Sequence, residues 1–451
     1  MGNAAEDAPG EAAPEPVRDA ELVPDAELVP DAEPAPDAEP VPRSRLLFRN
    51  RDYTGWWIGQ TISEFGSALS LVAYPLLVLA ETGSAAGAGV VAAAVSIGGL
   101  VTMLIGGALA DRFSRKTIMI VVPLVQAAAV GTVAAAVVTG NVTVAQIGVV
   151  GFIQGMGTGL AGGAEFASLR RVVEAEQLPT AFAQLEARNM TIFLVGPTAG
   201  GFLFGVARWV PFFGDAVSFL ASATGVALIR RPLGPDQGEL GSRESVVASI
   251  GNGFRFIRGS AYLRFVTVWG ALGNATVPAL LLLVIILIHA QHGSPALIGV
   301  VTSIGAVGGL GGALASPMIA RHVPGRLLVI AVSWMAAVVA AGIAAVPDPW
   351  AIAVLLALLL FLVAPINVVL SSYEAQMIPD ALMGAVSSAV NFAASSLRWL
   401  GAIGAGFLAS VLSPAAATLI YAAVLGAMAV STHIAKGLYV LRQPITEAAA
   451  D

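Results

Sequence analysis

Twelve long apolar segments constrain this chain more than any other feature of its sequence. They occupy residues 55–79, 87–109, 117–139, 143–166, 185–207, 211–230, 264–289, 296–320, 326–346, 350–373, 385–411 and 415–436. A helix needs about 20 apolar residues to cross the hydrocarbon core of a bilayer. Only 12% of the residues are charged, against about 25% in soluble proteins. The sequence therefore predicts an all-α integral membrane protein with twelve transmembrane helices.

Two short sequences recur at a common offset of 205 residues. Gly-Gly-Ala-Leu-Ala occurs at 106–110 and at 311–315, and Gly-x4-Gly-Phe-Leu occurs at 196–203 and at 401–408. Two matches at one offset, both inside apolar segments, indicate a duplicated membrane bundle with both copies running in the same direction. We therefore expect two pseudo-symmetric six-helix bundles, at residues 51–231 and 263–440.

The segments outside the two bundles are polar. Residues 1–50 form an acidic tail rich in Pro and Ala, in which Asp-Ala-Glu recurs at 19, 25, 31 and 37. A segment with so little apolar surface is expected to be disordered. Residues 441–451 form a second, short tail. Residues 232–262 are expected to link the bundles, and in this linker Val246, Ile250, Phe254 and Ile257 recur at helical spacing. That helix either lies on the inner leaflet or simply leads into the seventh span.

The basic residues predict the orientation of the chain. If the N-terminus lies inside, nearly every Lys and Arg falls in a cytoplasmic flank or loop, and only Arg208 falls in an external connection. This bias matches the positive-inside rule. We expect a multi-pass protein of the cell (inner or plasma) membrane with both termini in the cytoplasm.

Several functions are disfavoured by what the sequence lacks. There is no Cys, so thiolate metal sites and disulfides are excluded. There is no Gly-x4-Gly-Lys-Ser/Thr motif, which a built-in ATP-driven motor would need. His289 and His292 can share a helical face but have no third ligand. We expect no enzyme activity, no cofactor, no metal site and no nucleic-acid partner, and a monomer in the bilayer.

The loop after the second apolar segment carries a family resemblance. Residues 107–116 read Gly-Ala-Leu-Ala-Asp-Arg-Phe-Ser-Arg-Lys, which resembles the loop motif of the major facilitator superfamily, with Ser114 in place of a Gly. Within that superfamily the chain is similar to the drug/proton antiporter branch that contains the enterobactin exporter and the macrolide efflux proteins. The segments that support this are Trp57-Ile58-Gly59-Gln60, Leu178-Pro179 and Asp215-Ala216-Val217-Ser218-Phe219.

The resemblance implies a conformational latch formed by Gly107, Asp111, Arg112 and Arg115. Gly107 permits close approach of span two to span eleven. Asp111 then meets the positive end of that helix, a contact worth about 0.3–1 kcal/mol. Arg112 and Arg115 need acidic partners, for which Glu374, Asp380, Glu165 and Glu174 are candidates. The family pattern implies that this cluster closes the cytoplasmic side while the cavity opens outward. The alternative is an ordinary basic loop.

Spans four and five bear on the direction of transport. Span five contains Gly196, Pro197, Gly200 and Gly201, which match the Gly-Pro-x-x-Gly-Gly end of a motif typical of drug exporters, with Ile192 where the pattern begins with Gly. Residues 154–157 of span four match the end of the proton-antiporter motif Arg-x-x-Gln-Gly-x-Gly, but Gly151 stands where that motif has its Arg. The motif residue tied to proton coupling is therefore missing, and coupling must use other residues.

Charged residues inside spans are costly, about 2.5–3.5 kcal/mol each at the bilayer centre, and persist where they are paired or face water. Glu64, Asp215 and Arg398 are the candidates for ion coupling, with Glu64 first, Asp215 next in line, and a static Glu64–Arg398 pair as the alternative. For Asp215 itself, a structural hydrogen bond to a neighbouring helix is the favoured role. Polar residues expected to line a substrate cavity are Gln60, Gln154, Thr158, Asn274, Asn367 and Asn391.

These observations together predict a secondary active efflux transporter for a small amphipathic organic compound, such as a drug, an antibiotic or a siderophore-like metabolite. Its partners are the bilayer, the small-molecule substrate and a driving ion, a proton or another cation. Two alternatives stay open. One is a proton-coupled uptake symporter, and the other is a transporter-like membrane sensor that moves nothing.

Overall fold

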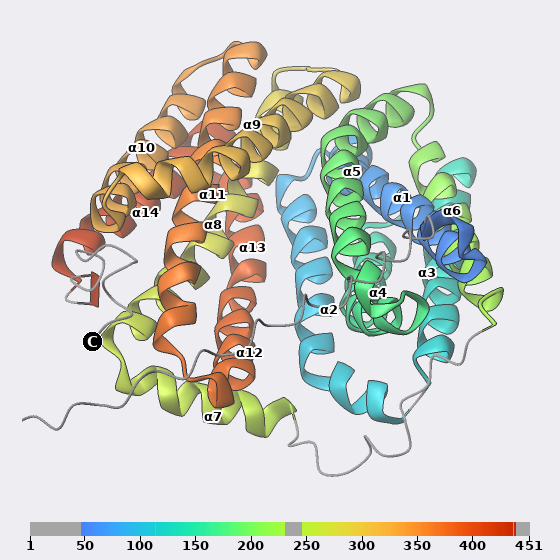
Figure 1. The fold of residues 1–451 in the computed structure, drawn as a ribbon. Coiled ribbons are helices and arrows are strands. Elements are labelled where there is room, and N and C mark those ends of the chain that lie inside the picture. The colour runs from blue at the N-terminus through green and yellow to red at the C-terminus, as the bar shows by residue number, and fades with distance from the viewer. Residues whose placement is uncertain (1–46, 113, 231–245, 436, 439–451) are drawn as a thin grey trace, which may run out of the picture. The chain divides into compact units, whose positions relative to one another are not determined.

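The computed structural model describes residues 47–112, 114–230, 246–435 and 437–438, all within Leu46–Asp451, the second of two compact units in the chain. Side chains are not described at 104–112, 161–167, 170, 175, 246–249, 375 and 380–381. Most of the predicted acidic tail, most of the predicted linker before residue 246 and the tail at 441–451 lie outside the described residues. Within the described ranges every regular element is a helix (Figure 1).

The helices follow the predicted spans closely. The first half contains the short 3-10 helices η1 (Leu47–Arg49) and η2 (Ala175–Gln177) and the α-helices α1 (Arg51–Thr82), α2 (Ala85–Arg112), α3 (Arg115–Thr139), α4 (Val144–Val172), α5 (Leu178–Val206) and α6 (Val210–Ala227). The second half contains α7 (Val246–Gly259), α8 (Ala261–Ala290), α9 (Pro295–His322), α10 (Gly325–Ala345), α11 (Pro349–Met377), α12 (Asp380–Ser396), α13 (Arg398–Val411) and α14 (Pro414–Ile434).

Eleven helical stretches among the described residues are long and apolar enough to cross a bilayer. The remaining predicted span, the fourth (143–166), corresponds to α4, whose described apolar part, Val144–Leu160, is shorter. The predicted eleventh span is broken in two at Leu397, so that Arg398 begins α13. The described part of the chain is therefore that of a multi-span, helical membrane protein.

Local sequence sets the helix ends. The side chain of Asn50 accepts hydrogen bonds from the backbone of Asp52 and Tyr53 and so caps α1. Ser and Thr residues cap α3, α4, α8, α9 and α14 in the same way, each satisfying a backbone N–H that the helix leaves unpaired. Gly83, at φ 63°, ends α1 in the left-handed region that favours glycine.

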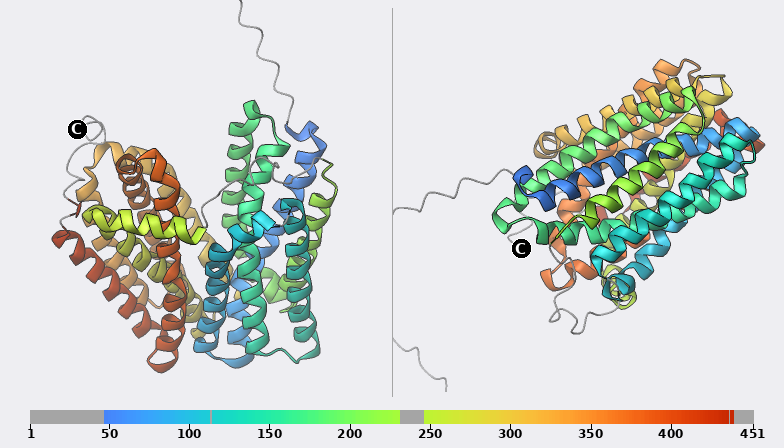
Figure 2. Two further views of the ribbon diagram at one scale, coloured as in Figure 1. Left: turned by 90° about the horizontal axis from the view of Figure 1, so that it is seen from below. Right: turned by 90° about the vertical axis from the view of Figure 1, so that its right-hand side faces the viewer.

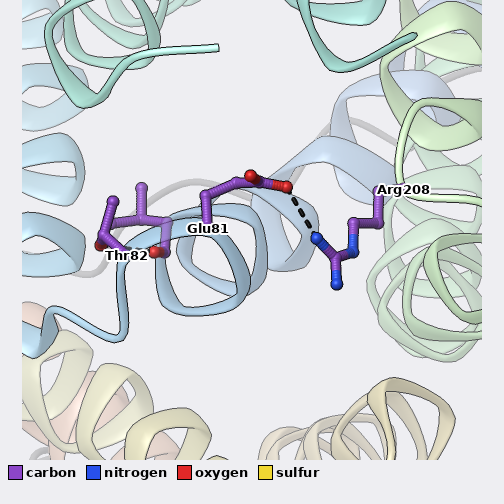
Figure 3. A network of polar contacts seen from close by, with 4 residues as sticks. Glu81, Thr82 and Arg208 are labelled. Atoms are coloured by element: carbon purple, nitrogen blue, oxygen red, sulfur yellow. Dashed lines mark hydrogen bonds and ion pairs between the residues drawn. The ribbon is translucent and has the colours of Figure 1, made fainter. Parts of the chain in front are cut away.

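The connection between α5 and α6 carries the isolated basic residue of the predicted external loops. Arg208 donates from Nη1 to Oε1 of Glu81, at the end of α1, over 2.7 Å (Figure 3). Both side chains are partly exposed, so the pair contributes at most about 1 kcal/mol to stability. Glu81 thus neutralises Arg208, the basic residue in the predicted external connections of the first bundle.

The two halves repeat the same packing with a changed register. In the first half α2 packs on α4, and in the second half α9 packs on α11. The ends of α4 and α11 differ by 205 residues, whereas the ends of α2 and α9 differ by 210. The helix contacts give the same register, because a Cβ on Gly98 would overlap the carbonyl oxygen of Phe152 and one on Gly308 would overlap that of Ala357. Positions 210 apart in α2 and α9 thus meet positions 205 apart in α4 and α11, so Gly107 and Gly312, which the 205-residue repeat would make equivalent, stand at different heights. The other repeated pair, Gly201 and Gly406, stands five residues before the end of α5 and of α13.

The predicted linker helix exists as α7 and crosses the axes of the neighbouring helices (Figures 1 and 2). Ile250, Gly253 and Ile257 are buried, and α7 packs on α12, where a Cβ at Gly253 would overlap the backbone of Ala385. Arg255 and Arg258 are exposed. The apolar face of α7 is therefore occupied, at least in part, by α12, and Ser260 alone separates α7 from α8.

Candidate functional site

Two close helix crossings join the halves. We call the side where α1 begins the N-terminal side, and the side where α1 ends the opposite side. At one crossing α5 meets α9, where a Cβ on Gly299 would lie 2.6 Å from the carbonyl oxygen of Pro197. At the other α13 meets α2, where a Cβ on Gly406 would lie 2.5 Å from the carbonyl oxygen of Ala85. Only glycine permits backbones to approach this closely.

Both crossings lie toward the opposite side. On α5 the contact glycine, Gly201, is five residues from the helix end on that side, and on α2 the contact glycine, Gly89, is four residues from its start there. The halves are thus in backbone contact where the odd-numbered spans of the first bundle end. Backbone contact at these crossings narrows any passage from a site between the halves to that side.

A cavity of about 550 Å³ lies deeper than these crossings, toward the N-terminal side. It is lined on α2 by residues between Val95 and Met103, and on α5 by Asn189, Ile192 and Phe193. Residues of α1, α4 and the α12–α13 junction complete its walls. Both halves therefore contribute to one chamber, which has the size of a small-molecule site.

Four of the predicted site residues line this cavity. They are Glu64 of α1, Gln154 and Thr158 of α4, and Arg398, the first residue of α13. Glu64 and Arg398 come from different halves and are both exposed to the cavity. Arg398 also donates to Oδ1 of Asn274 over 3.4 Å. The structure thus brings an acid and a base into one largely apolar chamber.

Other predicted cavity residues lie elsewhere. Gln60 is buried, and its Oε1 accepts a hydrogen bond from Ser222 over 2.7 Å, so it joins α1 to α6. Asn274 and Asn367 line a smaller, mostly apolar cavity of about 170 Å³ inside the second half, and Asn367 also lines a third cavity of about 420 Å³ with Asn189. Asn391 is exposed and lines none of these three cavities.

Asp215 lies behind the cavity wall and is fully buried. Its Oδ2 accepts a hydrogen bond from the side-chain amide of Gln154 over 2.9 Å, and its Oδ1 accepts longer ones from Ser67 and Ser218. Ser67 and Gln154 belong to the cavity lining. The predicted structural hydrogen bond to a neighbouring helix is therefore present, and it ties Asp215 to the cavity.

The export motif packs α5 against two helices. A Cβ on Gly196 would overlap Ala68 of α1, one on Gly200 would overlap the backbone of Leu69, and Gly201 faces α9 in the other half. Pro197 lies between them and its carbonyl oxygen faces Gly299. These small residues therefore fix α5 both to its own bundle and to the other half.

The side chains of the predicted latch fall mostly outside the described residues. The backbone of Gly107, Asp111 and Arg112 belongs to the last turns of α2, but their side chains lie outside the description, as do those of Glu165 and Asp380. Arg115 is half-buried at the start of α3. Next to it Lys116 donates to the backbone oxygen of Ile229 over 2.7 Å, which ties α3 to the end of α6.

Three polar residues near the site were not predicted. Arg188 is 6% exposed in α5, although it stands close enough to the start of that helix to resemble an ordinary flanking base. Ser70 and Tyr74 are 0% and 4% exposed. They follow Ser67 at three and seven residues on α1, a helical spacing that extends the polar face through Glu64 and Ser67, and that spacing is a signal from which they could have been found.

Comparison with known proteins shows what this chain is similar to. A family model described as Major Facilitator Superfamily matches residues 56–402. Multidrug efflux pump Tap of Mycolicibacterium fortuitum is 26% identical over 356 residues, which cover 76% of this chain and 86% of that protein. The crystal structure of the nucleoside transporter NupG has a TM-score of 0.66 at 14% identity, covering 86% of this chain and 98% of that one. A bacterial homologue of the iron transporter ferroportin, in an inward-facing state, has a TM-score of 0.62 at 15% identity, covering 85% and 99%.

Proposed function

The chain belongs to the Major Facilitator Superfamily, and we propose that it is a secondary active efflux transporter that exports a small amphipathic organic compound by proton antiport. Its family makes it a transporter rather than an enzyme. The observation that carries the proposal is the cavity between the halves, whose polar groups include Glu64 and Arg398 among many apolar residues. Such a lining suits a compound with a large apolar body and a few polar or charged groups.

Export is favoured over uptake by two observations. The relative Tap is described as a multidrug efflux pump, and the Gly-Pro-x-x-Gly-Gly sequence is of the kind typical of exporters. In the proposed cycle the N-terminal side is cytoplasmic. The observed form, with its crossings closed on the opposite side, is then the form that loads substrate from the cytoplasm.

Transport in inverted membrane vesicles tests the proposal. If the chain is an exporter, acidifying the vesicle interior drives accumulation of an amphipathic fluorescent cation or of a test drug. An uptake symporter instead releases a preloaded compound when the same gradient is imposed. Absence of any flux with a broad compound panel, from well-expressed protein, favours the sensor.

We expect Asp111→Asn to lower transport about two- to fivefold, which corresponds to losing a charge–helix contact of about 0.3–1 kcal/mol. The contact belongs to one conformational state, so its loss shifts the equilibrium between states without unfolding the protein. Initial export rates in vesicles, normalised to expression, measure the effect. Glu176→Gln removes an exposed acid near the start of α5 and serves as the control, with an unchanged rate. Equal rates for both variants would rule out the latch.

A further inference from the structure

The buried carboxyl group of Asp215 has no positive partner among the described residues. Its side chain is 0% exposed, and its hydrogen bonds come from the neutral groups of Gln154, Ser67 and Ser218. An ionised carboxylate this deep in a membrane helix is costly unless a cation compensates its charge. The surroundings of Asp215 therefore need a source of positive charge.

Three buried oxygen atoms beside this carboxyl have no hydrogen-bond partner in the described part of the chain. They are Oγ of Ser70, the hydroxyl of Tyr74 and Oε1 of Gln154, whose residues are 0%, 4% and 7% exposed. The Gln154 amide that carries the third oxygen is the one that donates to Asp215. The Ser70 hydroxyl is close enough to the carboxyl to interact as a donor, although it does not form a well-aligned hydrogen bond, and Tyr74 is near enough to be affected by the charge of the carboxyl. Buried polar atoms are rarely left without partners, so three in one place require an explanation.

Helix geometry explains why these oxygens gather there. Ser67, Ser70 and Tyr74 lie on one face of α1 at spacings of three and four residues. That face meets α6 closely, since a Cβ on Gly66 would overlap the side chain of Ser218. Gln154 reaches the same point from α4. Three helices of the first half therefore bring a carboxyl group, several hydroxyl groups and one side-chain amide to a single buried position.

We propose that this cluster, centred on Asp215 with Ser67, Ser70, Tyr74 and Gln154, is a binding site for a monovalent metal cation, specifically Na⁺. Hard cations take several oxygen ligands at once, from carboxylates, carbonyls and hydroxyls. A proton on Asp215 would neutralise the charge but could donate to only one of the three unpartnered oxygens. One carboxylate balances one positive charge, which favours a monovalent ion over a divalent one.

The site communicates with the substrate cavity. Ser67, Tyr74 and Gln154 contribute both to the cluster and to the wall of the 550 Å³ cavity. A cation can therefore enter from the cavity, and once bound it fixes side chains that a substrate would touch. Through this shared wall the occupancy of one site alters the affinity of the other. A role of this Na⁺ in driving transport rests on the proposed transport function, whereas the binding of Na⁺ does not.

Direct binding of radioactive ²²Na⁺ to the purified full-length protein, without substrate and in choline chloride buffer, tests the site. We expect saturable binding of one ion per chain, displaced by unlabelled Na⁺ and unaffected by choline. Asp215→Asn keeps the size of the side chain and one acceptor oxygen but removes the charge. Loss of an outer-shell partner of a metal ligand typically costs about 10–100-fold in affinity, so we expect at least that loss here. Ser70→Ala and Tyr74→Phe should weaken binding by smaller factors.

The matched control is Ser316→Ala. Ser316 is as fully buried as Ser70, but its hydroxyl donates to the backbone oxygen of Gly312 in α9, far along the chain from the cluster. It should bind ²²Na⁺ like the parent. Size-exclusion profiles and thermal unfolding establish that each variant is folded.

Three outcomes overturn the site. They are no saturable ²²Na⁺ binding by folded parent protein, binding that survives unchanged in folded Asp215→Asn, and equal losses in Ser70→Ala and Ser316→Ala. Failure of the site is distinguishable from failure of the proposed function. A protein that exports in Na⁺-free vesicles but binds no ²²Na⁺ contradicts only the site. A protein that binds ²²Na⁺ but moves no compound contradicts only the transport function.

Discussion

We expect Gly201→Leu to lower export about 5–150-fold while leaving the protein folded. A Cβ at this position would already overlap the backbone of Pro295 and approach Gly299 in the other half. Overpacking of this kind costs about 1–3 kcal/mol, and an energy of that size changes a two-state equilibrium about 5–150-fold. The cost is incurred only when the α5–α9 crossing is closed, so the substitution favours the form that is open to the opposite side.

Cysteine accessibility measures this shift directly. The chain contains no Cys, so a single Ser96→Cys substitution in the cavity lining provides a reporter without background labelling. With Gly201→Leu, a membrane-impermeant thiol reagent should label this Cys faster from the opposite side and more slowly from the N-terminal side. Gly205→Leu is the control, because a Cβ at Gly205, one turn further along α5, meets nothing within 4 Å. Parental transport and labelling in Gly201→Leu would show that this crossing does not close the path.

The sequence predicted the helices better than it predicted their register. Apolar length alone located the spans, because each must cross the same hydrocarbon thickness. The repeat at 106–110 and 311–315 gave the wrong offset between α2 and α9, because a sequence of small residues such as Gly-Gly-Ala-Leu-Ala can stand at several positions along a closely packed helix. Neither Pro nor Gly stands at position 397, so nothing in the sequence predicted the helix break at Leu397.

The candidate site was predictable only in part. Glu64, Gln154 and Arg398 stood out because polar groups are rare inside apolar spans, and the cavity contains all three. Gln60 was misplaced because sequence spacing does not show whether a polar face meets a cavity or a neighbouring helix. The cluster around Asp215 joins α1, α4 and α6 across up to 148 positions of the chain. No local pattern reports such a meeting, although the spacing of Ser67, Ser70 and Tyr74 hints at it.

We expect Glu64→Gln to abolish uphill export while retaining substrate binding and downhill exchange. Antiport requires a group that takes up and releases a proton as the cavity changes sides, and a glutamine keeps the shape of the side chain without that ability. One pH unit corresponds to about 1.4 kcal/mol per proton. With one-for-one exchange the parent can therefore maintain about a tenfold concentration ratio per pH unit, whereas the variant should reach a ratio of about one. Steady-state accumulation in inverted vesicles at imposed pH differences measures both.

Normal accumulation by Glu64→Gln would show that the driving ion moves elsewhere. Removing Na⁺ from both the vesicle interior and the external medium then decides the matter, since accumulation that stops without Na⁺ assigns coupling to the Asp215 cluster. Accumulation that continues in both conditions would exclude coupling through either residue.

Variants of Arg398 distinguish two roles of Glu64, a proton carrier and one partner of a structural ion pair. It shares the cavity with Glu64, its side chain is exposed there, and it donates to Asn274. A group in contact with water need not unfold the protein when its neighbour is neutralised, so we expect Glu64→Gln and Arg398→Gln to express at parental levels. A buried ion pair without water would behave differently, because removing one partner costs about 3–5 kcal/mol of stability and removing both partners restores it.

The thermal stabilities of the two single variants and the double variant form a cycle that isolates the coupling between the residues. Additive effects on stability, together with lost uphill export in Glu64→Gln alone, identify Glu64 as the proton carrier, and a double variant more stable than either single one would identify a structural pair.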